Sequence, residues 1–209
     1  CPNNMKLKIL IIYFLLNLSL NLYSEKAKSL LILGDSISAG YGMSKEKQWS
    51  EVLKEKLNQE KISLKIINAS VSGETTGGGL VRSDKLLQNN MPSYLLIELG
   101  GNDALRGYPP QTVKNNLLEI INLGKTYGSK SIIMQIRIPP NYGNRYRNEF
   151  ESIYTEIAEE TGSLYMPFML NNIALEKNLM MADGIHPTEE AQPLIAEEIF
   201  NYLKNLGIY

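Results

Sequence analysis

The chain has 209 residues, of which 44% are hydrophobic and 21% are charged, and its net charge at pH 7 is -1. This length suits one well-cored domain and is too short for two of ordinary size. The composition is that of a globular protein rather than a disordered one. Because the chain has no basic stripe with interleaved aromatic residues, we expect no nucleic-acid partner.

The start of the chain has the features of a signal peptide. Two lysines precede an apolar run over residues 9–16, and polar residues then weaken the run before Ser24. A transmembrane anchor needs about 20 predominantly apolar residues, so we favour export with cleavage after Ser24 over an uncleaved anchor. The chain then divides into upstream residues and signal peptide (1–24) and a single domain (25–209). We expect a periplasmic or secreted protein with no stable membrane anchor after cleavage.

Cysteine and histidine, the commonest zinc ligands, are scarce in this chain. Cys1 is the only cysteine, and it lies before the expected cleavage point, so the mature protein has no thiolate and no disulfide. His186 is the only histidine, which argues against a histidine-based zinc site. We therefore expect no metal and no cofactor.

After residue 25, short apolar runs alternate with stretches of helical periodicity. In the first of these stretches, Trp49, Val52, Leu53 and Leu57 have the spacing of one helix face. The runs predict strands at 30–33, 64–67, 94–99, 131–136 and 163–166, and the periodic stretches predict helices near 49–57, 80–87, 113–124, 150–158 and 188–206. This alternation predicts an α/β fold with a parallel sheet and helices on both of its faces.

Two local features carry more specific expectations. The glycine run over residues 77–79 lacks the lysine of a phosphate-binding loop, and we expect it to form a flexible approach to the second helix. We also expect the last helix to bury Leu194 among its apolar residues.

In open α/β sheets, ligands bind beyond the carboxyl ends of the strands. The segments that follow the predicted strands, and the stretch beyond the last of them, are 34–37, 68–73, 100–103 and 183–187. Three of these segments contain glycine where the chain leaves the strand, which allows backbone N–H groups to approach a ligand closely. The chemistry of the protein is expected here.

His186 is the candidate general base. A lone histidine is most often structural, but Asp183 lies three residues earlier and Pro187 keeps His186 in a loop. An aspartate at this spacing can accept a hydrogen bond from one ring nitrogen and leave the other as a base. Acid–base work on a nucleophile is therefore the favoured role.

Ser36 is the candidate nucleophile, since a serine hydroxyl needs an adjacent base to become reactive. The backbone N–H groups of Ser36 and Gly73 and the side-chain amide of Asn102 are candidates for stabilising an oxyanion. Two alternatives remain: Ser36 could simply cap a helix or turn, and Asp35 with Asp103 could form the carboxylate pair of a glycosidase.

Together, four blocks resemble the SGNH (GDSL) hydrolase family: Gly34-Asp35-Ser36-Ile37, Asn68-Ala69-Ser70-Val71-Ser72-Gly73, Gly100-Gly101-Asn102-Asp103 and Asp183-Gly184-Ile185-His186-Pro187. The resemblance implies a catalytic triad of Ser36, Asp183 and His186 and an oxyanion hole formed by Ser36, Gly73 and Asn102. It implies a three-layer α/β/α sandwich with a five-stranded parallel sheet of flavodoxin-like order 2-1-3-4-5. It also implies a periplasmic serine hydrolase acting on fatty acyl thioesters, lysophospholipids and small aryl esters.

This strand order places the fifth strand roughly 14 Å from the first. His186 cannot reach Ser36 from the end of the fifth strand. The segment over residues 168–183 is long enough to carry it back across the sheet, although periodicity does not show that it does.

The loops around these blocks predict the substrate. Their mainly apolar residues, Met181 among them, favour an acyl chain. The tentative substrate-binding set is Leu105, Tyr108, Ile138, Tyr142, Met180 and Ile185. The expected partner is a small acyl ester or thioester, and we expect a monomer. A carbohydrate acetylesterase of the same family and a non-catalytic lipid-binding protein remain as alternatives.

Overall fold

The computed structural model describes residues 27–209, and the predicted signal segment lies outside them. Within the described residues, five parallel strands form one sheet in the order β2-β1-β3-β4-β5. The strands are β1 (Lys28–Gly34), β2 (Leu64–Asn68), β3 (Tyr94–Glu98), β4 (Lys130–Met134) and β5 (Leu164–Met166). The predicted parallel sheet and its strand order are confirmed.

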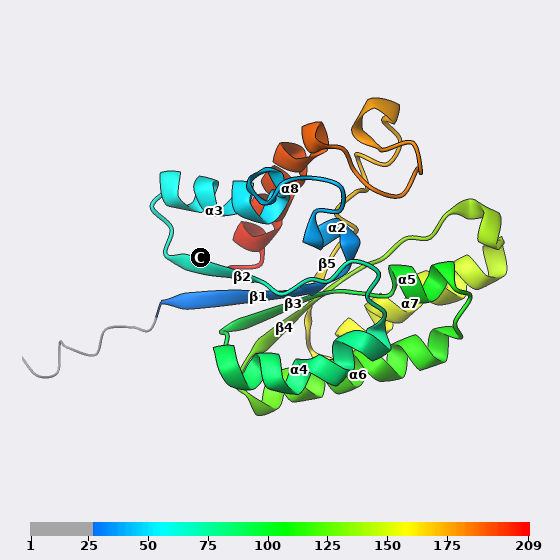
Figure 1. Ribbon diagram of the computed structural model, residues 1–209. Coiled ribbons are helices and arrows are strands. Elements are labelled where there is room, and N and C mark those ends of the chain that lie inside the picture. The colour runs from blue at the N-terminus through cyan, green and yellow to red at the C-terminus, as the bar shows by residue number, and fades with distance from the viewer. Residues whose placement is uncertain (1–26) are drawn as a thin grey trace, which may run out of the picture.

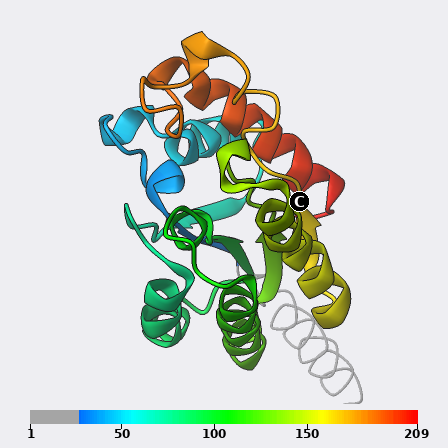
Figure 2. The same cartoon turned by 90° about the vertical axis from the view of Figure 1, so that its right-hand side faces the viewer.

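Helices cover both faces of the sheet (Figure 1). One face carries α3 (Trp49–Gln59) and α8 (Gln192–Asn205), and the other carries α4 (Thr76–Asn90), α6 (Pro110–Thr126) and α7 (Asn144–Thr161). Figure 2 shows the sheet between these two helical layers. The predicted three-layer α/β/α sandwich is confirmed. Among residues 27–209, no helix is both long and apolar enough to cross a membrane.

Strand β1 shows why the strands are apolar without alternation. Successive side chains of a strand point to opposite faces. Leu30 and Ile32 pack against the α3 and α8 side, and Leu31 and Leu33 pack against the α4, α6 and α7 side. All four are at most 1% exposed, and burying one such side chain contributes roughly 1.5–3 kcal/mol. A sheet covered on both faces needs apolar residues at every position.

The structure adds five short helices that the periodicity did not predict. They are α2 (Ser36–Ala39), α5 (Gly101–Leu105) and the 3-10 turns η1 (Lys45–Lys47), η2 (Pro140–Tyr142) and η3 (Lys177–Leu179). A further 3-10 turn, η4 (Glu189–Ala191), lies within the predicted last helix and leads directly into α8. Elements of three to five residues are too short to show a 3.6-residue repeat. Two of them, α2 and α5, directly follow strands β1 and β3.

Two local expectations are wrong. The glycine run 77–79 lies inside α4, which begins after Thr75 caps it by accepting a hydrogen bond from the Gly78 N–H. Gly79 is needed there because a β-carbon on it would lie 2.4 Å from Leu99 Cδ1; close packing of α4 on the sheet offsets the weak helix propensity of glycine. Leu194 is 48% exposed, since α8 turns this side chain to solvent.

Candidate active site

Ser36 lies in a tight turn at the end of β1, residues 34–40, here called the nucleophile turn. Asp35 caps α2 by accepting a hydrogen bond from the Ile37 N–H at 3.1 Å, and Ser36 is the first residue of that helix. Gly40 ends α2 in the left-handed region, with φ at 70°. Ser36 is therefore presented by a short helix that starts directly above the sheet.

The segment between β5 and η4, residues 167–187, carries His186 back across the sheet and is here called the histidine loop. Asp183 Oδ1 accepts hydrogen bonds from the backbone N–H groups of Ile185 and His186. Asp183 Oδ2 lies 2.7 Å from His186 Nδ1, and His186 Nε2 lies 2.8 Å from Ser36 Oγ. The three predicted residues therefore form one continuous chain of hydrogen bonds.

The charge of Asp183 decides which atoms donate and which accept in that chain of hydrogen bonds. Burial alone would raise the pKa of Asp183, but hydrogen bonds from the backbone and side chain of His186 and from the Ile185 N–H lower it to about 2. An ionised Asp183 can only accept, so His186 Nδ1 carries a proton and Nε2 is left to accept from the Ser36 hydroxyl.

Three candidate oxyanion donors come from the ends of adjacent strands. Ser36 follows β1, Gly73 follows β2, and Asn102 lies in the first turn of α5 after β3. Asn102 Nδ2 donates one hydrogen bond to Asp35 Oδ2 at 3.2 Å, and its second hydrogen remains for a ligand. Gly73 adopts φ of 79°, a conformation that glycine adopts without strain.

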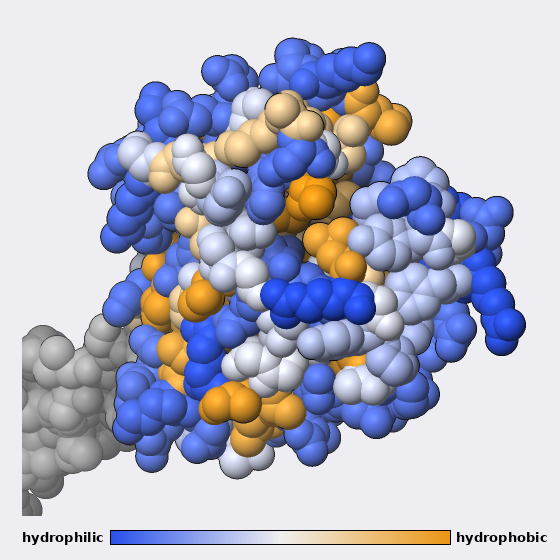
Figure 3. Space-filling model, turned by 45° about the vertical axis from the view of Figure 1, so that its right-hand side comes forward, coloured by the Kyte–Doolittle hydropathy of each residue, from blue (hydrophilic) through white to orange (hydrophobic). Residues whose placement is uncertain are grey.

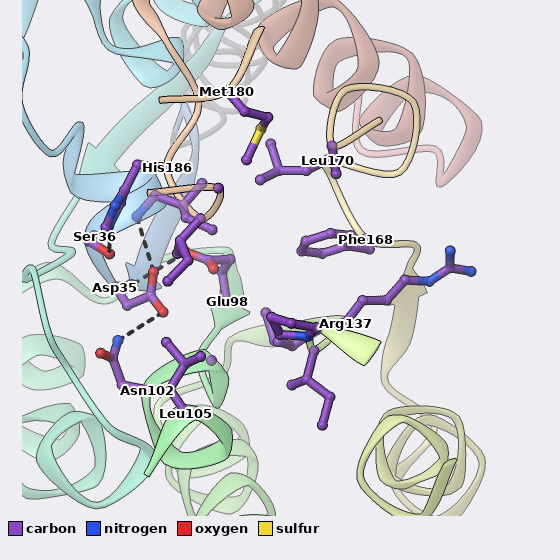
Figure 4. Close-up of a pocket in the computed structure, with 18 of the residues that line it drawn as sticks. Asp35, Ser36, Glu98, Asn102, Leu105, Arg137, Phe168, Leu170, Met180 and His186 are labelled. Carbon is purple, nitrogen blue, oxygen red and sulfur yellow. Dashed lines mark hydrogen bonds between the residues drawn. The ribbon is translucent and has the colours of Figure 1, made fainter. Parts of the chain in front are cut away.

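Asp35 in the nucleophile turn and Glu98 at the end of β3 form a buried carboxyl pair, and Figure 4 shows both side chains beside Ser36. Glu98 Oε2 accepts hydrogen bonds from the Ser38 hydroxyl at 2.7 Å and from the Asp35 N–H at 3.3 Å. Burial, together with the neighbouring Asp35 charge, raises the pKa of Glu98 well above its usual range. Burial also raises the pKa of Asp35 to about 6. A neutral Glu98 thus supports the turn from below.

Asp103, the other member of the proposed glycosidase pair, has a separate partner. Asp103 Oδ2 accepts from the Thr76 N–H and Oδ1 accepts from the Thr76 hydroxyl, which fixes the start of α4 to α5. Asp35 in turn caps α2. Because both carboxylates hold helix termini, the structure gives no support to a glycosidase pair.

An apolar cavity of about 950 Å³ opens beside Ser36, Asn102 and His186. Figure 3 shows hydrophobic side chains gathered in a hollow on this face of the molecule, with hydrophilic residues around it. This volume lies within the range of about 300–1,000 Å³ that is typical of pockets for small molecules.

Four of the predicted substrate-binding residues line this cavity: Leu105, Ile138, Met180 and Ile185. The other two, Tyr108 and Tyr142, do not, and neither does Met181, which was expected among the apolar residues of the same loops. The Tyr142 hydroxyl donates to the Leu105 carbonyl from outside the cavity, the Tyr108 side chain is exposed, and Met181 lies against Gly42. These three were predicted from proximity in sequence, which does not fix the direction of a loop side chain.

A scan against protein-family models matches residues 32–193 to the GDSL-like lipase/acylhydrolase family. The chain belongs to this family. The match covers all four sequence blocks and every residue of the Ser36–His186–Asp183 chain.

Relatives in the GDSL-like lipase/acylhydrolase family are similar over most of this chain. An arylesterase from Vibrio mimicus is 45% identical over 92% of this chain and 94% of its own length. The thioesterase 1/protease 1/lysophospholipase L1 of Escherichia coli strain K12 is 42% identical over 92% and 91%. The crystal structure of the psychrotrophic esterase EstA from Pseudoalteromonas sp. is 41% identical, with a TM-score of 0.85 over 87% of this chain and 100% of that one. The predicted family and the predicted class, an ester or thioester hydrolase, are confirmed.

The sequence predicted only part of the far wall of the cavity, namely Ile138 and Met180. The rest of that wall also comes from the loop after β4 and from the histidine loop: Ile136, Arg137, Pro139, Phe168, Leu170 and Leu175. In Figure 4, Phe168, Leu170 and Met180 lie across the cavity from Asp35 and Asn102. Phe168 and Leu170 stand in an irregular stretch, so the one available signal was their apolar character.

Proposed function

We propose that this protein hydrolyses carboxylic esters and thioesters of apolar acids through an acyl-enzyme on Ser36. The observation that supports this most is the Asp183–His186–Ser36 hydrogen-bond chain, with distances of 2.7 and 2.8 Å, at the mouth of an apolar cavity. Such a chain supplies a nucleophile and its base, and the cavity supplies room for the acyl group.

In the first step, Ser36 Oγ attacks the substrate carbonyl carbon while its proton passes to His186 Nε2. The ionised Asp183 stabilises the imidazolium that forms. The tetrahedral oxyanion accepts hydrogen bonds from the backbone N–H groups of Ser36 and Gly73 and from Asn102 Nδ2. Collapse breaks the ester or thioester bond, and His186 returns its proton to the leaving alcohol or thiol.

In the second step, water attacks the acyl-enzyme. His186 accepts a proton from this water, and the carbonyl oxygen again occupies the oxyanion donors. Breaking the bond to Ser36 Oγ releases the carboxylic acid, and His186 gives the proton back to Ser36. The enzyme is restored with no cofactor and no net change in its charge.

The substrates we propose are fatty acyl thioesters, lysophospholipids and small aryl esters. The apolar cavity wall, with Leu105, Ile138, Met180 and Leu175, favours an acyl chain over a sugar. The names of the Vibrio mimicus and Escherichia coli relatives point to the same classes. We also propose that the mature protein is an exported monomer with one domain, cleaved after Ser24.

The test is active-site labelling combined with an ester panel. A fluorophosphonate should label the purified protein on Ser36, found by peptide mapping, and Ser36→Ala should abolish labelling and hydrolysis. Ser152→Ala, which removes an exposed hydroxyl of α7, should leave both unchanged. Turnover should rise from acetyl toward longer p-nitrophenyl esters. Label on another residue, or turnover confined to an acetylated sugar, would refute the proposal.

A further inference from the structure

Tyr41 has an unusual position for a large aromatic residue. It follows α2 between two glycines in the left-handed region, Gly40 with φ of 70° and Gly42 with φ of 77°. Its side chain is 51% exposed, yet its ring lies on the imidazole of His186, with ring centroids 4.3 Å apart and planes inclined by 31°. One face of the catalytic imidazole is therefore covered by tyrosine.

The same residue is tied to the nucleophile through its backbone. The Tyr41 N–H donates to the Ser36 carbonyl at 3.0 Å, and the imidazole that the Tyr41 ring covers lies 2.8 Å from Ser36 Oγ. Each of the three residues thus contacts the other two: Ser36, His186 and Tyr41. A shift of the imidazole away from Ser36 has to break the ring contact as well.

The geometry of the two hydrogen bonds of His186 explains why its third contact, with the Tyr41 ring, matters. Its bonds to Asp183 and Ser36 both lie at ring nitrogens, in the plane of the imidazole. Hydrogen bonds at the edge of a ring restrain movement in the plane much more than tilting out of it. A second ring against its face restrains that tilt.

Near this point the backbone hydrogen bonds of the histidine loop are made within the loop, such as that from the Met181 N–H to the His186 carbonyl at 2.8 Å. Asp183 is 39% exposed in its side chain, and the loop meets the turn after α2 through Met181, whose Cε lies 3.3 Å from the position of a β-carbon on Gly42. Tyr41 and Gly42 together therefore form the surface on which this end of the loop rests.

We propose that Tyr41 is a positioning residue for His186, resting on the triad chemistry proposed above. Its ring keeps Nε2 within reach of Ser36 Oγ. When His186 takes the proton of Ser36, the same ring face also attracts the imidazolium, since cations within about 6 Å of an aromatic ring are stabilised.

The test compares Tyr41→Leu, which removes the aromatic face, with Tyr41→Phe, which keeps it. Tyr127→Leu, on the far end of α6 where the tyrosine hydroxyl bonds Asp84, controls for the loss of a tyrosine. The first measurement is the rate of Ser36 phosphonylation by a small alkyl fluorophosphonate, which reports nucleophile activation without an acyl chain. The second is the NMR spectrum of the His186 ring, which gives one set of signals because the chain has one histidine.

We expect Tyr41→Leu to slow phosphonylation by about 10- to 100-fold, as misplaced catalytic groups do, and to remove the ring-current shift of the His186 carbon-bound protons. Tyr41→Phe should keep the shift and stay within about threefold of the wild-type rate. Tyr127→Leu should change neither. If Tyr41→Leu lowers the melting temperature, Tyr41→Gln repeats the measurement with a side chain suited to an exposed turn.

Two results would overturn the inference. A rate unchanged in Tyr41→Leu despite loss of the ring-current shift would make the stacking incidental. An equal loss in Tyr41→Phe and Tyr41→Leu would assign the effect to the hydroxyl. Failure of the wild-type protein to react at Ser36 would instead refute the proposed function, so the two failures are distinguishable.

Discussion

The two halves of the candidate site are held in different ways. The nucleophile turn grows out of buried strand β1, with Asp35 3% exposed and Glu98 beneath it fully buried. The histidine loop carries Asp183 and His186 on an irregular segment whose side chains are 39% and 17% exposed. The sheet core thus fixes the nucleophile, whereas the acid–base pair relies on local contacts: the two backbone N–H bonds to Asp183, the Met181 N–H bond to the His186 carbonyl, and the Tyr41 ring.

Asp183→Asn tests the loop half and should give the largest effect. The asparagine Oδ1 can keep both backbone N–H bonds, so the loop keeps its shape, while its amide donates toward His186 Nδ1. That forces the proton to Nε2 and removes the base that faces Ser36. We expect kcat to fall by about 10⁴-fold with KM little changed, measured with a p-nitrophenyl ester.

The control for that variant is its melting temperature at neutral pH, which should stay close to that of the wild-type protein. A loss of kcat below about tenfold would show that Asp183 does not set the tautomer of His186.

Asn102→Ala tests the sheet half. If Asn102 donates to the oxyanion, the bond is stronger in the transition state than with the ground-state carbonyl. We then expect kcat to fall by about 10²–10³-fold, roughly 3–4 kcal/mol, while KM holds. Steady-state kinetics on a short ester separate the two constants, and a rise in KM alone would remove Asn102 from the oxyanion hole.

The sequence predicted the sheet half more fully than the loop half. The strands carried continuous apolar runs and the main helices carried periodicity, so their order and layers followed. Ser36, Gly73 and Asn102 follow three strands that are neighbours in the sheet, which places them together once the strand order is known. His186 was assigned to the site by its chemistry and its sequence block, because an irregular loop has no periodicity to follow.

The features that were missed depend on contacts between distant segments. The Asp35–Glu98 pair follows from the register that sets Gly34 beside Glu98, and a carboxylate in an otherwise apolar strand was its only sequence signal. Tyr108 and Tyr142 were placed at the substrate and lie outside the cavity, because apolar character does not fix the direction of a loop side chain. Phe168 and Leu170 line the cavity from a stretch that showed no pattern.

The contributions of the two halves to folding stability should also change with pH in opposite directions. The pKa of Asp35 rises on folding from 3.8 to about 6, so the folded state binds more protons and loses stability as pH rises from about 4 to 6. The pKa of Asp183 falls from 3.8 to about 2. The stability that Asp183 gives the folded state is fully present above about pH 4 and is lost as pH falls toward 2.

Urea unfolding of Asp35→Asn and Asp183→Asn at pH 2.5, 4 and 7 measures this difference. Asparagine still caps α2, so Asp35→Asn should reduce the loss of unfolding free energy between pH 4 and 7 by about 2 kcal/mol. Asp183→Asn should reduce only the loss of unfolding free energy that occurs as pH falls from 4 to 2.5. If both variants had the wild-type pH dependence, neither carboxyl would titrate as its surroundings imply.

Each half of the candidate site contributes one wall of the cavity. The preference of variants for short or long acyl chains compares the two walls. Leu105 belongs to α5 after β3, and Met180 belongs to the histidine loop. Replacing either by alanine removes apolar contact with a long acyl chain, so kcat/KM for an octanoyl ester should fall by about tenfold, roughly 1–2 kcal/mol, while an acetyl ester is unaffected. The irregular histidine loop can partly close the gap at Met180, whereas helix α5 cannot do so at Leu105, and the Leu105→Ala loss should therefore be larger. Equal losses on both esters would show that these residues support the catalytic groups rather than the chain, and a larger loss at Met180 would show that the histidine loop is the more rigid wall.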